Sequence, residues 1–152
     1  MNGRIVDRLT FLGTGDAMGV PRVYCDCEVC EEARSGGSNR RLRSSVLIEG
    51  SSGDFLMDCG PDWRLQMEMI NRRADITDIV ITHAHFDHIG GLPEWADACR
   101  WQQRVGRVFA PQEVLDLIGR QFPWIHHHLE LIANDDGMIL SGWKLTPWKV
   151  HH

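Results

Sequence analysis

The chain has 152 residues, 43% of them hydrophobic and 24% charged, which is the composition of an ordinary globular protein of about one domain. Its 16 basic and 21 acidic side chains give a net charge of −5 with histidine neutral, which argues against a nonspecific nucleic-acid binder. No apolar run approaches the roughly 20 residues of a membrane-spanning helix, and residues 1–15 lack the pattern of a signal peptide. We therefore expect a cytoplasmic protein that does not act at a membrane.

The predicted elements mix strands with helices. In chain order, strands are predicted at 4–12, 45–49, 54–57, 78–82 and 108–109, with three more within 129–150, and helices at 28–34, 61–71, 92–103 and 111–121. Gly50-Ser51-Ser52-Gly53 predicts the turn of a hairpin between two of the strands. Strands grouped with interleaved helices predict an α/β (α+β) layered sandwich, here as one domain over residues 1–152.

Three cysteines lie close together in the first third of the chain. Cys25, Cys27 and Cys30 fall within six residues, and Cys59 and Cys99 bring the total to five. An odd count without an export signal argues against a disulfide framework. Three thiolates on one tight loop suit a structural zinc ion, which takes four nitrogen or sulfur ligands, whereas the alternative is three unligated thiols. We expect residues 20–43 to form a zinc-binding loop insertion.

One dense basic stretch follows the cysteines, Asn39-Arg40-Arg41-Leu42-Arg43. A solvated loop before a strand and a surface that faces a phosphate group explain it about equally well.

The richest cluster of potential ligands directly follows the strand predicted at 78–82. His83, His85, Asp87 and His88 lie within six residues. Imidazole suits zinc or iron, and a carboxylate also tolerates manganese. The spacing of the first two histidines lets both reach one ion, while Asp87 and His88 can reach a second. An accidental cluster is the alternative, and its position at the carboxyl end of a strand, where α/β proteins bind ligands, makes that less favoured.

Residues 82–92, THAHFDHIGGL, resemble the signature of the metallo-β-lactamase superfamily of binuclear metallohydrolases. Residues 56–60, LMDCG, fit the short strand that ends in aspartate and precedes this signature in the family. The resemblance implies an αββα sandwich with two divalent ions, zinc or manganese, at the active site. It implies a supporting role behind the metals for Asp58, because ligand histidines need an acceptor that fixes their tautomer.

The same resemblance implies how the ligands are shared. His83, His85 and a histidine after a later strand would bind the first ion, and Asp87 and His88 would bind the second and form the catalytic pair. For the later histidine we favour His152, with His151 as the alternative.

A second resemblance is to the PhnP-type cyclic phosphodiesterases, through FLGTG at 11–15, GVP at 19–21 and CDCEVC at 25–30. Arg43-Ser44-Ser45 and Pro61-Asp62 fit that group as well. It implies that the cysteines hold a structural zinc and that a metal-bridging hydroxide attacks a small cyclic phosphate or nucleotide. The cysteine pattern extends to PqqB, in which the histidine motif is degraded, so the complete motif here favours a working hydrolase.

The resemblance covers only the N-terminal part of the family, and a bridging aspartate and two further histidines of the family have no counterpart in residues 1–152. Two alternatives therefore stay open: another hydrolase of the superfamily, acting on thioesters, lactones or RNA 3′ ends, and an inactive zinc-binding fragment. A homodimer would cover the exposed surface of such a half-sandwich.

Overall fold

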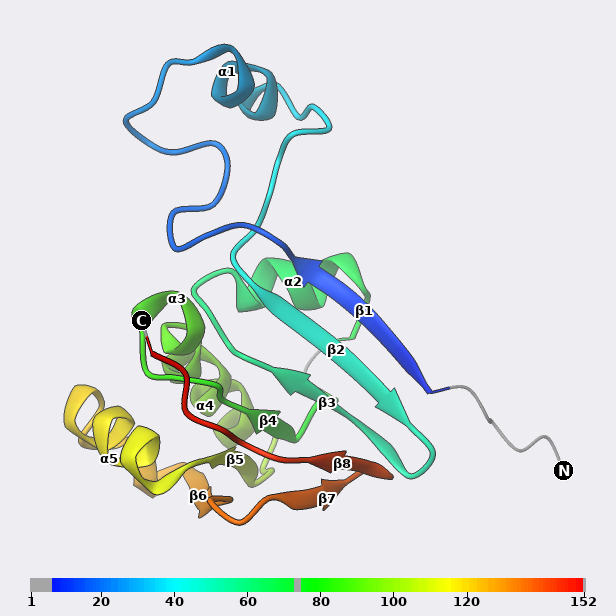
Figure 1. Cartoon of the computed structure of the whole chain (residues 1–152), viewed down its shortest axis with the longest axis vertical. Helices are drawn as coiled ribbons and strands as arrows, with labels where there is room; N and C mark the ends of the chain where they lie inside the picture. Colours follow the sequence, from blue (N-terminus) through cyan, green and yellow to red (C-terminus); the bar gives the residue numbers. More distant parts are fainter. Residues whose placement is uncertain (1–6, 73–74, 152) are drawn as a thin grey trace, which may run out of the picture.

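The computed structural model of the chain describes residues 7–72 and 75–151. Within them, six strands form one sheet in the order β1-β2-β3-β4-β5-β6, and β7 and β8 form a separate hairpin (Figure 1). The strands are β1 (Arg8–Gly13), β2 (Ser45–Gly50), β3 (Gly53–Met57), β4 (Asp78–Val80), β5 (Gly106–Ala110), β6 (Leu129–Ala133), β7 (Met138–Leu140) and β8 (Trp143–Leu145). The helices are α1 (Glu28–Arg34), α2 (Trp63–Met69), α3 (Phe86–Ile89), α4 (Leu92–Trp101) and α5 (Gln112–Gln121), with a 3₁₀ turn η1 (Ile125–His127).

The sheet changes character along its width. Pairs β1–β2 and β2–β3 are antiparallel, whereas β3 to β6 run parallel to one another. Parallel neighbours need crossover connections, and α2, α4 and α5 lie in these connections. The carboxyl ends of four strands therefore meet at one edge of the sheet, which is where α/β proteins place their ligands.

One face of the sheet packs against the helices. Side chains alternate between the two faces of a strand, so one apolar row crosses the sheet through Leu47, Leu56, Ile79 and Val108, which occupy paired positions. This row belongs to the larger core cluster, which includes Trp95 of α4 with no exposed surface. Fully buried aromatic and branched side chains of this size account for most of the hydrophobic stabilisation of a domain.

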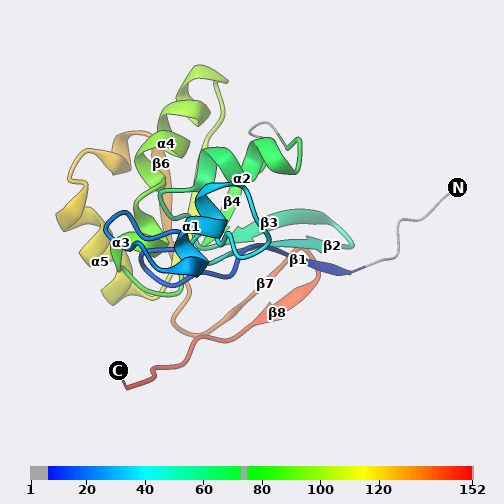
Figure 2. The same cartoon turned by 90° about the horizontal axis from the view of Figure 1, so that it is seen from above.

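The opposite face packs against the β7–β8 hairpin. Ile48, Phe55, Val80 and Phe109 form a second cluster with Leu140 of β7. Figure 2 shows β7 and β8 on one side of the sheet and α2 and α4 on the other. The layers are thus helices, sheet and hairpin, as the predicted α/β sandwich requires.

Residues 14–44, which we call the cysteine-bearing segment, leave the body between β1 and β2 and carry α1 (Figure 1). Two isolated bridges close the base of this segment, Gly15 with Arg43 and Val20 with Arg41. The segment is therefore a long excursion whose two ends run side by side.

The predicted elements agree with the structure in kind and differ at their ends. The helix predicted from Pro61 begins at Trp63 instead, because Gly60–Asp62 form a turn in which Trp63 N–H donates to Gly60 O. The helix predicted to run to Gln103 ends at Trp101, since Gln103 has a φ of 56°. The strand predicted from Arg4 is described from Arg8 onward, and residues 4–6 lie outside the described residues.

Helix α3 has no counterpart among the predicted elements, which leave residues 83–88 as an extended loop. In the described part of the chain, no helix is both long and apolar enough to span a membrane.

The hairpin contact predicts a stability difference between two apolar residues. Phe55→Ala should lower the free energy of unfolding by about 3–5 kcal/mol, because the fully buried ring fills the space between the sheet and β7. Ile139→Ala, at a position 77% exposed, should change it by less than about 0.5 kcal/mol. Urea unfolding followed by circular dichroism measures both, and equal losses would contradict the packing described.

Candidate metal centres

The histidine loop joins β4 to α3. The chain leaves the sheet after Ile81, and His85 serves as the N-cap of α3 with extended backbone (φ −74°, ψ 148°). The N–H groups of His88 and Ile89 both donate to His85 O, at 2.9 and 3.1 Å. His85 consequently stands on extended backbone, whereas Asp87 and His88 lie within the four-residue helix α3.

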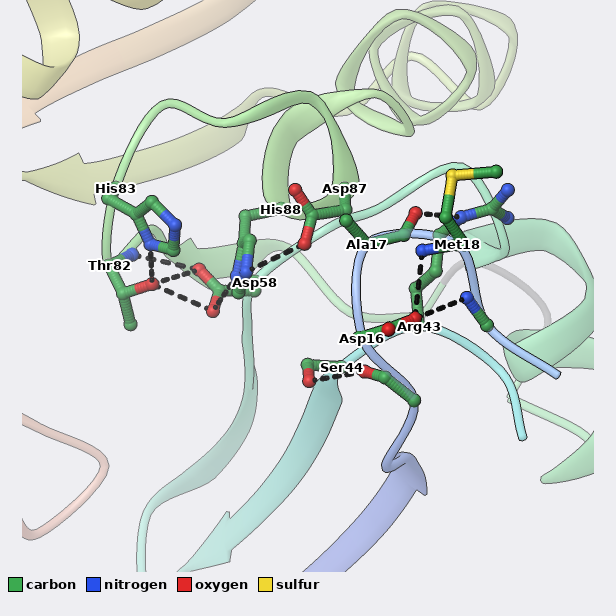
Figure 3. Close-up of polar contacts among 12 residues, drawn as sticks. Asp16, Ala17, Met18, Arg43, Ser44, Asp58, Thr82, His83, Asp87 and His88 are labelled. Atoms are coloured by element: carbon green, nitrogen blue, oxygen red, sulfur yellow. Dashed lines mark hydrogen bonds and ion pairs between the residues drawn. The ribbon is translucent and has the colours of Figure 1, made fainter. Parts of the chain in front are cut away.

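Asp58 holds this loop from the end of the neighbouring strand β3. Its carboxylate accepts hydrogen bonds from the Thr82 N–H at 2.8 Å and from the Thr82 hydroxyl at 2.9 and 3.0 Å. The same carboxylate contacts His88 Nδ1 at 2.7 Å (Figure 3). Asp58 is 6% exposed and has a φ of 64°, a left-handed conformation that is unusual for an aspartate.

These contacts fix which ring nitrogen of two histidines carries a proton. A carboxylate only accepts, so His88 donates from Nδ1 and the Thr82 hydroxyl donates to Asp58. With its proton used, that hydroxyl accepts from His83 Nδ1, which lies 3.0 Å away. In both neutral rings Nε2 is then the nitrogen with the lone pair that a metal ion needs.

The exposed side of the loop brings ligand atoms together in pairs. His88 Nε2 lies 3.1 Å from Asp87 Oδ2. Two ligands bound at about 2.1 Å and at right angles to one ion are about 3 Å apart, so this pair has the spacing of neighbouring ligands. The ring centroid of His83 is 4.7 Å from that of His85 and 4.0 Å from that of His88.

The histidines of this loop differ electrostatically. The hydrogen bond with Asp58 raises the pKa of His88, with further help from the Asp87 carboxylate. Burial lowers the pKa of His83, and the nearby charge of His88 adds to that effect. A lone pair on His88 Nε2 would face the Asp87 carboxylate, and either a proton or a metal cation between them removes the repulsion. The donor set of nitrogen and carboxylate oxygen therefore fits a zinc or manganese ion.

A tight seam of backbone supports α3 from below. Cys59 N–H donates to His88 O and Gly91 N–H donates to Cys59 O, both at 2.8 Å. A Cβ added to Gly60 would lie 2.1 Å from Asp87 O. Only glycine fits at position 60, because the backbone there is in direct contact with the backbone of Asp87.

A groove of about 950 Å³ lies beside the loop, between α5 and the segment after β8. Gln121 at the end of α5 donates to Ala84 O at 3.0 Å, and Lys149 contacts Glu113 across the groove at 3.0 Å. Apolar side chains line much of it, among them Val80, Ala84, Val114, Leu117, Leu145, Trp148 and Val150.

A second cluster lies in the cysteine-bearing segment. The sulfur atoms of Cys25, Cys27 and Cys30 all lie within 4.8 Å of one another. Tetrahedral zinc with sulfur ligands at 2.3 Å separates them by about 3.8 Å, so the three thiols fit one ion. Hydrogen bonds, first from the Cys30 backbone and then from the other two thiols, lower the pKa of Cys27 and favour its thiolate.

The structure places the residues singled out in the sequence as follows. Among the described residues, no three ligand atoms of His83, His85, Asp87 and His88 lie within 4.8 Å of one another, so each ion would need ligands from elsewhere. His152 lies outside the described residues, and His151 is exposed. Thr82 and Gln121, which bind the loop through hydrogen bonds, were missed because their partners are distant in the sequence.

Residues 39–151 match the model of the Metallo-beta-lactamase superfamily. The chain belongs to this superfamily. The match includes the histidine loop, Asp58 and the groove, whereas Cys25, Cys27 and Cys30 lie before it.

Three relatives show the range of this superfamily. A structure described as a new diphosphatase from the PhnP family is 32% identical, with a TM-score of 0.75, and the match covers 90% of this chain and 54% of that one. The octanoyltransferase of Porphyromonas gingivalis is 38% identical over 112 residues, which are 73% of this chain and 22% of that protein. Ribonuclease Z of Methanococcus maripaludis is 29% identical over 130 residues, 84% of this chain and 36% of its own length. The chain thus spans about half of the solved structure and less of the two curated relatives.

The seam below α3 predicts a large effect of one methyl group. Gly60→Ala should lower the free energy of unfolding by about 2–3 kcal/mol, because its Cβ would meet backbone oxygen rather than a side chain that can move. Gly119→Ala in α5, where nothing lies within 4 Å of the added Cβ, should raise it by about 0.5–1 kcal/mol. Urea unfolding compares the two, and a neutral Gly60→Ala would contradict the seam.

Proposed function

We propose that this chain carries the metal-binding half of a metal-dependent hydrolase that cleaves phosphodiesters. The observation that carries the proposal is the Asp58–Thr82 network, which keeps the metal-binding lone pair of His83 and of His88 on Nε2. Relatives of this superfamily include a PhnP-family diphosphatase that is 32% identical, and this supports phosphate chemistry. A small phosphorylated substrate would reach the loop from the groove described above.

The residues divide the work as follows. His83 and His85 would hold one divalent ion with His152, and Asp87 and His88 would hold a second. Divalent ions bound there supply Lewis acidity, which lowers the pKa of water and stabilises charge on phosphoryl oxygens. Asp58 keeps His88 in the tautomer that binds metal and holds the loop through Thr82.

The cysteines would hold a separate structural zinc. Cys25, Cys27 and Cys30 supply three ligands, and the fourth would come from a residue outside the described chain or from water. We propose that this site folds residues 20–43 and takes no part in the chemistry.

A second candidate is hydrolysis of an acyl ester or thioester. The apolar lining of the groove beside His83 and His85 favours it, because a fatty acyl chain would bury against Leu117 and Trp148. The match to an octanoyltransferase is consistent with acyl chemistry, although it covers only 22% of that protein. The two candidates predict opposite results with p-nitrophenyl phosphodiesters and p-nitrophenyl octanoate.

Metal counting and hydrolysis together test the proposal. Native mass spectrometry of the purified chain should show one zinc lost with Cys27→Ser and further ions lost with His83→Ala or His88→Ala. Hydrolysis of bis(p-nitrophenyl) phosphate should fall at least about a hundredfold in His88→Ala and stay unchanged in His126→Ala, which alters an exposed histidine of η1. A zinc-loaded chain that is inert toward both substrate classes would support the inactive-fragment alternative and contradict the proposal.

Removing the charge of Asp58 predicts a selective loss of metal. Asp58→Asn keeps the size of the side chain but can present its amide N–H₂ to His88, which then turns its lone pair inward. Affinity for zinc at the histidine loop should fall about 10–100-fold, with the cysteine site unchanged. Competition with a chromophoric chelator measures both sites, and an equal loss at both would indicate general unfolding instead.

A further inference from the structure

Arg43 is the last residue of the basic stretch, and it joins three segments. Its guanidinium donates from Nε to Ala17 O at 3.2 Å (Figure 3). It also donates from Nη1 to Asp62 Oδ1 at 2.8 Å. Its backbone N–H donates to Asp62 Oδ2 at 2.9 Å, and its carbonyl accepts from the buried Gln66 at 3.0 Å. The side chain is 27% exposed, so this arginine is built into the structure instead of lying in solvent.

Asp62 does not make the capping hydrogen bond that commonly stabilises the start of a helix. It occupies the N-cap position of α2, where an aspartate normally accepts a hydrogen bond from the helix backbone. Its side chain makes no such bond, and both of its carboxylate oxygens instead accept hydrogen bonds from Arg43. A cap of this kind raises the free energy of unfolding by about 1 kcal/mol, so the contacts with Arg43 have to offset its loss.

From Asp62 the contact continues directly to the histidine loop. Asp62 follows Gly60 by two residues, and Gly60 lies against the backbone of Asp87. Cys59 is bonded to His88 and Gly91 through its backbone. This seam has no room for a side chain, so a displacement of residues 59–62 displaces α3 as well.

On its other side Arg43 contacts the cysteine-bearing segment at Ala17. Ala17, whose carbonyl it binds, belongs to the turn that Asp16 closes by accepting from Met18 and Gly19. Asp16 also pairs with Arg22, at 2.5 Å.

Arg22 in turn contacts the first cysteine. Its carbonyl accepts from Cys25 N–H at 3.1 Å. Arg34 of α1 donates to the carbonyls of both Arg22 and Cys25, at 2.8 and 2.6 Å. Hydrogen bonds and short stretches of backbone therefore link the cysteine cluster through Arg43 to the histidine loop.

We propose that Arg43 is a positioning residue, through which an occupied cysteine site holds the histidine loop in the conformation that binds metal. The cysteine site is then coupled to the histidine site instead of only stabilising its own segment. The inference rests on the proposed function for what the loop binds, whereas the coupling concerns the chain alone. The mechanical link would be a segment that is ordered around its ion and anchored at Asp62.

Cobalt binding to the whole chain tests the coupling, since thiolate-to-cobalt absorption reports the cysteine site and the weaker visible bands report the histidine site. Cys27→Ser should weaken cobalt binding at the histidine loop about tenfold, within the usual range for coupled sites. In Arg43→Met the loop should already be weakened by a similar factor, and adding Cys27→Ser should change it less than about twofold. Arg41→Met is the matched control, because within residues 7–72 and 75–151 the guanidinium of Arg41 donates only to Ser38 O and Arg40 O.

Hydrogen exchange provides a readout that does not need an ion in the histidine loop. One equivalent of zinc at the cysteine site should slow amide exchange in residues 83–91 of the original chain and of Arg41→Met, but not of Arg43→Met. Asp62→Asn keeps the size of the side chain and a residue type that favours the N-cap of α2. It should behave like Arg43→Met, and it guards against a variant that simply fails to fold.

Three outcomes separate the possibilities. An equal effect of Cys27→Ser with and without Arg43, or exchange in residues 83–91 that ignores zinc, would overturn the coupling. Failure of cobalt to bind the histidine loop of the original chain would overturn the proposed function, and the exchange result would then decide the coupling by itself. Non-additive cobalt affinities with Arg43-dependent protection would establish it.

Discussion

The histidine loop depends on one buried carboxylate. Asp58 stands at the end of β3 in a left-handed conformation and accepts hydrogen bonds from Thr82 and His88 of the next parallel segment. Burying a carboxylate is costly unless its oxygens are hydrogen-bonded, so the site satisfies Asp58 at the same time as it orients two rings. The orientation of the two rings and the joining of the segments that follow β3 and β4 therefore depend on the same carboxylate.

The larger elements were predictable because their patterns are local. Ile79 and Val80 lie in a β-branched run, Gly50–Gly53 mark a turn, and α4 and α5 keep helical spacing, so the class of fold followed from the sequence. Helix α3 was not predictable in this way, because four residues are too few to show a period. It is supported by the hydrogen bond from Cys59 N–H to His88 O, which forms only after the chain folds.

The candidate site shows the same division. Cys25, Cys27 and Cys30 are neighbours in the sequence, and their spacing alone predicted that their sulfur atoms would meet. The basic stretch allowed both a solvated loop and a phosphate-facing surface, and neither accounts for Arg43, whose partners Ala17 and Asp62 lie 26 and 19 residues away. Spacing identifies groups that converge within one loop, but it carries no information on which distant carboxylate an arginine will bind.

The seam at Gly60 and Gly91 tolerates substitution much less than the walls of the groove. A Cβ at either glycine would meet backbone oxygen, so no other residue fits there without a displacement. The groove walls come largely from α5 and residues 144–150, and they touch the loop backbone where Gln121 donates to Ala84 O. Substitutions in the groove walls would therefore alter what binds beside the histidine loop while leaving this seam unchanged.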